Sequence, residues 1–544
     1  MRARSTRWAL VLLSGLGALG LFFAYYRQSR TVAVRSDGGS VALQAWDMLH
    51  GNLLLQHWHM SDVSFWSTEL VQYALLEAVH GLGPGVVHLG GAMTYTLLLV
   101  LAALLAAGRA TGRQALARVL IAAAVMVAPA AAASPTLLLT PDHLGSAVPV
   151  LLAWLAVDRL SPPGPGGPAP AAHRVVPWLL PVLVMLLLAW GQVADSLILL
   201  TGAAPMALAC GIRAAVRLRH RPPGSFPWLE VRLAAAAVLS AGLAHGAEAL
   251  IRISGGYVLQ PVATTFVRRS ELVHVVKLTV LGVAALFGVS FSGHPSRPEL
   301  FFSAVHLVTL LAVAVAGLLA LTRLGRAGDL MIGGLALGIV INAAAYVATP
   351  YAQNLLSTRE LAAVLPLGAV LAGRQLAGPL AGPLLWARRR RGRQLRAGCL
   401  AVLATVLVLD VAALGYHAAQ PARPADNQAL ADWLVTHHLT AGLSTDYWVA
   451  NSTTLDAGGQ VTVRQISINH HWRLARPVTW GNRSDWYDPN QYRATFIVVD
   501  DARPGAWIAE WQGAVRAFGR PARTLHPDGY TVMVWHRNLL AGIR

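Results

Sequence analysis

Residues 84–107 read PGVVHLGGAMTYTLLLVLAALLAA, and the six residues that follow, 108–113, read GRATGR. The first segment contains no Asp, Glu, Lys or Arg and is long enough to cross the ~30 Å hydrocarbon layer of a bilayer as a helix. Two arginines come directly after it. Apolar blocks of this kind, each followed by a short polar loop, recur along most of the chain. The sequence therefore indicates a protein that crosses a membrane many times.

The composition supports the same class. Of the 544 residues, 55% are hydrophobic and only 12% are charged. A soluble domain has about 25% charged residues, so a cytosolic globular enzyme is excluded. A disordered chain is poor in apolar residues, so disorder is excluded as well.

The net charge of +18 comes from arginines that gather in particular loops between apolar blocks. Short loops rich in Arg stay on the cytoplasmic side and so record the orientation of a membrane chain. The positive charge therefore reports topology, and we expect no nucleic acid partner. The groups are Arg2, Arg4 and Arg7; Arg109, Arg113 and Arg118; Arg213, Arg217, Arg219 and Arg221; and Arg388 to Arg391 with Arg393 and Arg396.

The apolar blocks predict about eleven transmembrane helices. The first is interpreted as an uncleaved span with a cytoplasmic N-terminus, because its apolar part is too long for a signal peptide. The block at 275–292 is treated as interfacial or re-entrant, since a crossing there would place the arginines at 388–391 outside. The predicted spans are 8–26, 84–107, 115–133, 143–158, 175–192, 196–212, 229–250, 300–321, 329–349, 361–377 and 397–416.

The chain divides into a transmembrane domain, 1–416, and an extracytoplasmic domain, 417–544. Within the first, 27–83 and 251–299 are large outer loops. The last part has ordinary polarity and alternating runs at 460–464, 495–499 and 530–535, which are typical of strands. Helical periodicity at 426–438 and 504–518 completes the pattern of a small α/β domain.

The first outer loop carries the sequence Ser36-Asp37-Gly38-Gly39-Ser40, which leads into a helix that ends near Gly51. We expect this helix to lie along the membrane surface with Asp37 just before it. A carboxylate at this place is suited to act as a general base for an acceptor hydroxyl. Capping of the helix by Asp37 and Ser36 is the alternative.

Further along the same loop, His57, His59 and Asp62 are weak candidates for a divalent metal site. Their residue types suit a metal ion, but nothing in the spacing directs the three side chains to one point. A metal cofactor is therefore left open.

Two further carboxylates stand at outer ends of spans, Asp142 beside His143 and Asp195 in a hairpin. An acid at the edge of the hydrocarbon usually faces a cavity or a partner. An N-cap is the alternative, and it is preferred for Asp195.

Arg359 lies on the outer side, where positive charge is avoided. Its planar guanidinium suits a phosphate group, whereas an ion pair with Glu360 or an anchoring role are the alternatives. Arg268 and Arg269, in the second outer loop, raise the same question.

Together these features resemble the GT-C glycosyltransferases, most closely the protein-mannosyltransferase-like and aminoarabinose-transferase-like group. The sequence SDGGSVALQAWDMLHGN (36–52) is similar to that group's acidic stretch followed by a helix. The sequence LLLTPDHLG (137–145) resembles its acidic turn between the third and fourth spans. The sequence STRELAAVLPLGAVLAGR (357–374) resembles its late Arg-containing stretch.

The resemblance implies an inverting enzyme of the plasma membrane that moves a sugar from a polyprenyl-phosphate donor to a glycan, lipid or protein of the cell envelope. It makes Asp37 the general base and Asp142 a second catalytic carboxylate. The donor phosphate would bind Arg359, with Arg268 and Arg269. The substrate would contact His143, Tyr351 and Asn354.

One difference from the family is that Gly38 follows Asp37, where many members have a second acid. This difference keeps a catalytically inactive scaffold open as an alternative. A lipid or saccharide transporter is the other alternative, and it predicts paired acids within spans and an internal repeat. The sequence shows neither feature.

Overall fold

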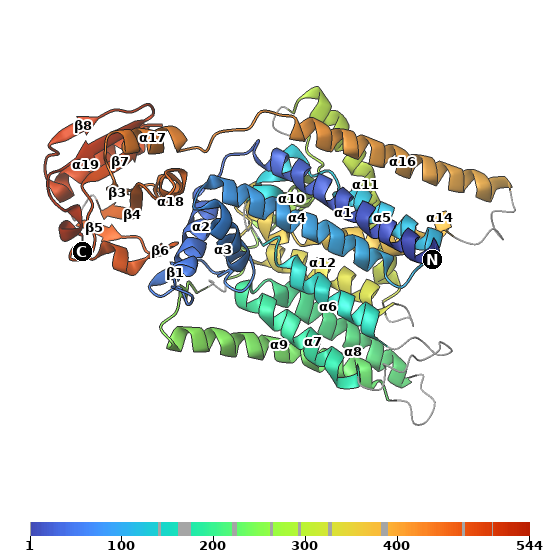
Figure 1. Cartoon of the computed structure of the whole chain (residues 1–544). Coiled ribbons are helices and arrows are strands. Elements are labelled where there is room, and N and C mark those ends of the chain that lie inside the picture. Colours follow the sequence, from blue (N-terminus) through green and yellow to red (C-terminus); the bar gives the residue numbers. More distant parts are fainter. Residues whose placement is uncertain are drawn as a thin grey trace.

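The computed structural model describes residues 2–139, 143–161, 176–219, 226–261, 265–291, 295–324, 329–381, 390–469, 474–502 and 504–543. It consists of a helical bundle with a small α/β domain against one of its ends (Figure 1). The long helices of the bundle are α1 (Arg2–Ser29), α4 (Pro84–Ala107), α5 (Gly112–Met126), α6 (Ala147–Leu160), α7 (Val176–Ala194), α8 (Ala204–Arg219), α9 (Trp228–Ile253), α11 (Arg297–Thr322), α12 (Leu330–Ala348), α13 (Val364–Leu376) and α16 (Arg390–Ala418).

The bundle has the character of a membrane protein. Among the described residues, six helices are long and apolar enough to cross a membrane. A bent pair, formed by η5 (Leu355–Leu361) and α13 at 54°, would make a seventh. The count of eleven spans stays a prediction.

The two ends of the bundle differ in their charged side chains and in the elements that they carry. At one end, which we call the arginine-rich end, Arg213 and Arg217 pair with Glu230, and Arg374 pairs with Asp158 and Asp329. The N-terminus lies at this end, far from the C-terminal domain (Figure 1). The opposite end, which we call the domain end, carries the shorter helices α2 (Ser36–Leu49) and α3 (Glu69–His80).

The ambiguous apolar block forms α10 (Leu272–Leu286), which has 15 residues. At 1.5 Å per residue it is roughly 22 Å long, which is less than the hydrocarbon thickness. Its interfacial or re-entrant position stays a prediction.

The C-terminal domain is built on a six-stranded sheet with the order β5-β4-β3-β7-β9-β8. The predicted strands at 460–464, 495–499 and 530–535 are confirmed as β4, β7 and β9, and the predicted helices as α17 and α19. The elements are α17 (Gln428–Thr436), β3 (Ala441–Ser444), α18 (Tyr447–Asp456), β4 (Thr462–Asn469), β5 (Leu474–Pro477), β7 (Phe496–Asp500), α19 (Pro504–Phe518), β8 (Arg523–Leu525) and β9 (Tyr530–Val534).

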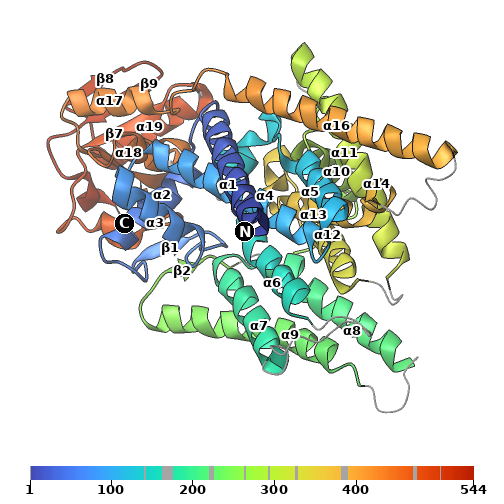
Figure 2. The ribbon, with the colours of Figure 1, turned by 45° about the vertical axis from the view of Figure 1, so that its right-hand side comes forward.

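Alternate residues of the central strand β7 pack on opposite faces of the sheet, as the two-residue period of a strand requires. Ile497 and Val499 join Phe518 of α19 in one core. Phe496 and Val498 join the core formed with α17 and α18 on the other face. Helix α18 therefore lies on the sheet with one side, and its other side faces α2 of the bundle (Figures 1 and 2).

A second, three-stranded sheet joins distant parts of the chain at the domain end. Strand β1 (Trp58–Met60) pairs with β2 (Val258–Leu259) and with β6 (Asn482–Arg483). These strands come from the first outer loop, the second outer loop and the C-terminal domain, respectively. The pairing fixes the C-terminal domain over the first outer loop, which positions the cavity described next.

Candidate functional site

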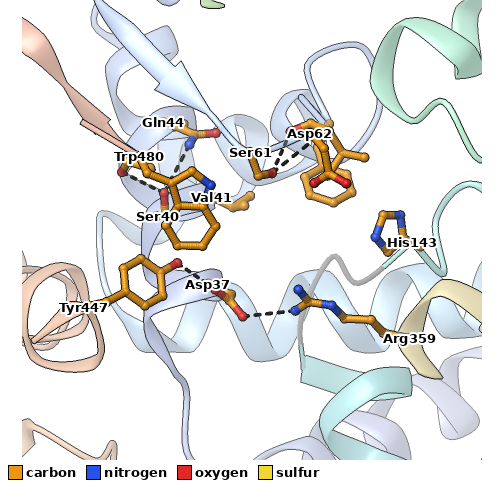
Figure 3. A pocket seen from close by; sticks show the side chains of 13 residues that line it. Asp37, Ser40, Val41, Gln44, Ser61, Asp62, His143, Arg359, Tyr447 and Trp480 are labelled. Atoms are coloured by element: carbon orange, nitrogen blue, oxygen red, sulfur yellow. Dashed lines mark hydrogen bonds and ion pairs between the residues drawn. The ribbon is translucent and has the colours of Figure 1, made fainter. Parts of the chain in front are cut away.

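A cavity of about 640 Å³, part of it open to solvent, lies between the first outer loop, the bundle and the C-terminal domain. Asp37 stands at its centre (Figure 3). The lining residues are Asp37, Ser40, Val41, Gln44, Ser61, Asp62, Val63, Phe65, His143, Arg359, Tyr447, Trp480 and Gly481.

The carboxylate of Asp37 is held from two sides. Its Oδ2 atom lies 3.2 Å from Nη1 of Arg359, and its Oδ1 atom accepts a hydrogen bond of 2.6 Å from the hydroxyl of Tyr447. The sequence predicted Asp37 just before the helix. Helix α2 begins at Ser36, however, so Asp37 lies in its first turn. The N-cap position belongs to Arg35, which makes no side-chain cap. Asp37 therefore faces the cavity, and the capping alternative is wrong.

The sequence Gly38-Gly39 explains how α2 comes so close to the C-terminal domain. A Cβ atom at Gly39 would lie 3.2 Å from the carbonyl oxygen of Asn451, which is tighter than ordinary contact. A Cβ atom at Gly38 would lie 3.0 Å from Val87, away from the cavity. A second acid at this position would therefore be buried against an apolar side chain, which is costly.

Two serines of α2 complete the contact between the domains. The Oγ atom of Ser36 donates to the backbone oxygen of Tyr447 at 2.6 Å. The Oγ atom of Ser40 donates to the backbone oxygen of Gly481 at 2.9 Å. These bonds fix the backbone of Tyr447 beside Asp37.

Arg359 reaches the cavity from η5, the short 3₁₀ helix before the bend into α13. The side chain of Asn354 caps this helix by accepting from the backbone N–H groups of Leu356 and Ser357. Asn354 is exposed and does not line the cavity, and its contact with a substrate stays a prediction. Tyr351 does not line the cavity, and Arg268 and Arg269 are exposed on the loop before α10.

His143 lies buried between two carboxylates. Its Nδ1 atom is 2.9 Å from Oδ2 of Asp195, and its Nε2 atom is 3.3 Å from Oε2 of Glu360. Burial lowers the pKa of His143, but Glu360 and Asp195 raise it by more, so the net pKa is well above its usual value. The charge of an imidazolium at this place is balanced by the carboxylates of Asp195 and Glu360. The other predicted carboxylate, Asp142, lies outside the described residues.

Asp195 performs both of the roles considered for it. Its Oδ1 atom accepts from the backbone N–H of Leu197 at 2.9 Å, as predicted for a cap, while Oδ2 faces His143. Glu360 pairs with His143. Sequence reasoning missed both partners of the histidine, since they come from separate turns of the bundle.

The candidate metal ligands do not converge. His59 lies in β1, whose backbone pairs with β6, and His57 lies just before that strand. Only Asp62 lines the cavity, where burial raises the pKa of its carboxyl. In the described part of the chain no three His, Cys, Asp or Glu side chains form a group that could hold a metal ion.

The cavity has two chemically different halves on either side of Asp37 (Figure 3). The charged half contains Arg359 and His143. The aromatic half contains Tyr447 and Trp480, whose ring centroids are 4.7 Å apart. Such a site can bind an anion on one side of a carboxylate base and a neutral molecule on the other.

No protein-family model matches the sequence, and no curated protein matches it. Similar solved structures include those of the oligosaccharyltransferase of Archaeoglobus fulgidus. The form tethered to an acceptor peptide with the NVT sequon has a TM-score of 0.50 and 12% identity, over 91% of this chain and 71% of that one. The apo form has a TM-score of 0.48 and 13% identity, over 93% and 71%.

A third form of this archaeal enzyme, AglB, contains an inhibitory peptide and a dolichol-phosphate. It has a TM-score of 0.46 and 13% identity, over 93% of this chain and 72% of that one. At such identities the likeness shows the fold alone. The fold is similar to that of the archaeal oligosaccharyltransferase, while membership of the GT-C glycosyltransferases and the subgroup stay predictions.

Proposed function

We propose that this protein is an integral-membrane glycosyltransferase that moves a sugar from a polyprenyl-phosphate donor to an acceptor outside the cytoplasm. The observation that carries the proposal is the setting of Asp37. This carboxylate lies between Arg359 and the hydroxyl of Tyr447, in a cavity that has a charged half and an aromatic half.

Asp37 is the general base in this proposal. It takes the proton from the acceptor hydroxyl as the acceptor oxygen attacks C1 of the donor sugar. The bond between C1 and the phosphate oxygen breaks, and the phosphate leaves with the electron pair. Arg359 stabilises the negative charge of the leaving phosphate with its guanidinium.

The arrangement of the two halves supports inversion at C1. The phosphate binds beside Arg359, and the acceptor approaches Asp37 from the opposite side, so attack and departure take place on opposite faces of the sugar. The substitution then occurs in one step.

The position of the cavity supports a lipid-linked donor. Arg359 lies at an end of the helical bundle, close to the bend between η5 and α13. A polyprenyl phosphate places its charged group at the edge of the hydrocarbon and its tail among the helices. The archaeal oligosaccharyltransferase, which shares the fold, has been seen with a dolichol-phosphate and with an acceptor peptide, and this supports a similar pair of substrates here.

The distribution of arginines supports an outward-facing site. Arg213, Arg217 and Arg374 lie at the end opposite the cavity. The positive-inside rule favours a cytoplasmic position for that end, which supports a cavity and a C-terminal domain on the outer side of the plasma membrane.

The proposal is tested with purified protein in lipid nanodiscs and a panel of polyprenyl-phosphate sugars. Release of polyprenyl phosphate is followed for the wild type, for Asp37→Asn and for Asp47→Asn. Asp47 is a matched control because it lies on the same helix and pairs with Arg483 at 2.9 Å, but outside the cavity. We expect release by the wild type and by Asp47→Asn, and loss of release in Asp37→Asn.

A catalytically inactive scaffold is the second candidate, and one observation favours it. Both oxygens of Asp37 already have partners, so the carboxylate could serve only to hold the C-terminal domain on the bundle. The scaffold predicts that no donor in the panel is cleaved by the wild type and that donor phosphate does not bind at Arg359.

A further inference from the structure

The two oxygen atoms of the Asp37 carboxylate face different chemistry. The Oδ2 atom contacts the charged half through Arg359, and the Oδ1 atom contacts the aromatic half through Tyr447. A base that receives a proton from an acceptor needs one oxygen free of the arginine. In this structure only Oδ1 meets that need among the contacts described, and the hydroxyl of Tyr447 occupies it.

The hydroxyl of Tyr447 marks the place of an oxygen that donates to the base. Its distance of 2.6 Å from Oδ1 is that of a short O–H···O⁻ hydrogen bond. An acceptor hydroxyl must occupy the same position before it can lose its proton to Asp37. Tyr447 and the acceptor therefore compete for one site.

The walls around this position suit a neutral sugar. The rings of Tyr447 and Trp480 form an aromatic surface at their side of the cavity (Figure 3). Ser40 and Gln44 add a hydroxyl and an amide, joined by a hydrogen bond of 3.2 Å. Aromatic rings present an apolar face to the C–H groups of a sugar ring, and neutral polar groups bind its hydroxyls.

We propose that the half of the cavity bounded by Tyr447 and Trp480 is the acceptor subsite, and that it takes a neutral saccharide whose reacting hydroxyl displaces the hydroxyl of Tyr447 from Asp37. This inference rests on the proposed function, because it uses Asp37 as the base. The acceptor hydroxyl gives its proton to Oδ1, its oxygen bonds to C1 of the donor sugar, and the phosphate departs with the electron pair of the broken C1–O bond.

The displacement needs only a movement of the Tyr447 side chain. The backbone of Tyr447 is fixed by the bond from Ser36 and by its place as the first residue of α18. The ring itself is only half-buried. A rotation of the side chain opens Oδ1 while the C-terminal domain stays in contact with α2.

This account predicts opposite effects for the two aromatic residues. Removal of the Trp480 ring takes away one wall of the subsite, and we expect saccharide affinity to fall about tenfold. Removal of only the Tyr447 hydroxyl, in Tyr447→Phe, takes away the competitor for Oδ1 and leaves the aromatic wall. We expect saccharide affinity to rise several-fold in this variant.

The test is saturation-transfer NMR with the full-length protein in nanodiscs. The saccharide probes are neutral tetrasaccharides, each built from one sugar: mannose, glucose, galactose or arabinose. The other probe is a peptide with Asn, Ser and Thr side chains. The variants are Trp480→Ala, Trp480→Phe, Tyr447→Phe and the control Trp511→Ala, an exposed tryptophan on α19 away from the cavity. Trp480→Phe retains a ring and should bind saccharide within about threefold of the wild type if stacking is the cause.

Saccharide binding that Trp480→Ala weakens, Tyr447→Phe strengthens and Trp511→Ala leaves unchanged would support the proposal. Binding of the peptide alone, binding of no saccharide, or equal saccharide binding in all variants would overturn it. Release of polyprenyl phosphate from the donor is measured on the same samples, with either the saccharide or water as the nucleophile that takes the sugar. Saccharide binding without any donor cleavage would refute the proposed function only, and donor cleavage without saccharide binding would refute the acceptor subsite only.

Discussion

The two ends of the helical bundle each hold an arginine between carboxylates, but the two clusters differ in what surrounds them. At the arginine-rich end, Arg374 bonds to Asp158 at 2.7 Å, to Asp329 at 2.9 Å and to the backbone oxygen of Leu105 at 2.8 Å. At the domain end, Arg359 lies 3.2 Å from Asp37 beside a cavity.

The two arginines differ in how much of each side chain is exposed to solvent. The side chain of Arg374 is 4% exposed, and its partner Asp158 is 10% exposed. The side chain of Arg359 is 38% exposed, and Asp37 is 25% exposed. A buried guanidinium that is bonded to several helices fixes them in place, whereas a half-exposed guanidinium beside a cavity can be reached by a ligand. We therefore assign a structural role to the first cluster and a chemical role to the second.

The largest effect on stability is expected at the arginine-rich end. The substitution Arg374→Met leaves Asp158 buried without its partner, which should cost about 3–5 kcal/mol in the free energy of unfolding. Thermal unfolding in detergent measures the change. The control is Arg323→Met, because Arg323 is an exposed arginine at the same end that bonds only weakly, at 3.1 Å, to Gln375. Equal melting temperatures for the two variants would contradict the structural role of Arg374.

At the domain end the expected loss is in turnover. The substitution Arg359→Gln removes the charge that stabilises the leaving phosphate, and we expect turnover to fall by about 10²–10³. Its melting temperature should change little, because a pair this exposed contributes only about 0–1 kcal/mol. Turnover is measured by release of polyprenyl phosphate, with Arg252→Gln as an exposed control at the end of α9. A loss of stability without a loss of turnover in Arg359→Gln would contradict the chemical role that we assign to Arg359.

A smaller effect concerns the pH dependence of stability through His143. Its folded pKa lies above the ordinary value of 6.5 because burial, which lowers it, is outweighed by Glu360 and Asp195. The contribution of His143 to the stability of the folded protein is thus complete below about pH 6.5. It is lost as the pH rises through the folded pKa of His143. We expect the melting temperature of the wild type to fall between pH 6 and pH 9 relative to that of His143→Gln. Parallel curves for the two proteins would show that His143 is not held as an imidazolium.

The sequence predicts the parts of the site that carry a local signal. Asp37 stands at the start of an amphipathic helix, Arg359 stands on the side predicted to be outside, and both line the cavity. The strands of the C-terminal domain follow from alternation, which short-range packing imposes. The membrane character follows from composition.

The remaining contacts depend on residues that are remote in the chain. Tyr447 is 410 positions from Asp37, and Arg374 is 216 positions from Asp158. No local pattern marks such pairs, since each depends on how whole helices pack. The cap made by Asn354 was not predicted for a related reason, because a polar side chain in an outer turn suits a ligand and a helix cap equally well.

The most direct test of the account compares two isosteric substitutions at the two ends, Asp37→Asn and Asp158→Asn, in the same nanodisc preparation. Release of polyprenyl phosphate and the melting temperature are measured for both. The account predicts that Asp37→Asn loses turnover by at least about 10³-fold with an almost unchanged melting temperature. Asp158→Asn should have a lower melting temperature than the wild type. At temperatures below this melting temperature, its turnover should be nearly that of the wild type. Normal turnover in Asp37→Asn, or loss of turnover in Asp158→Asn alone, would contradict the assignment of chemistry to the domain end.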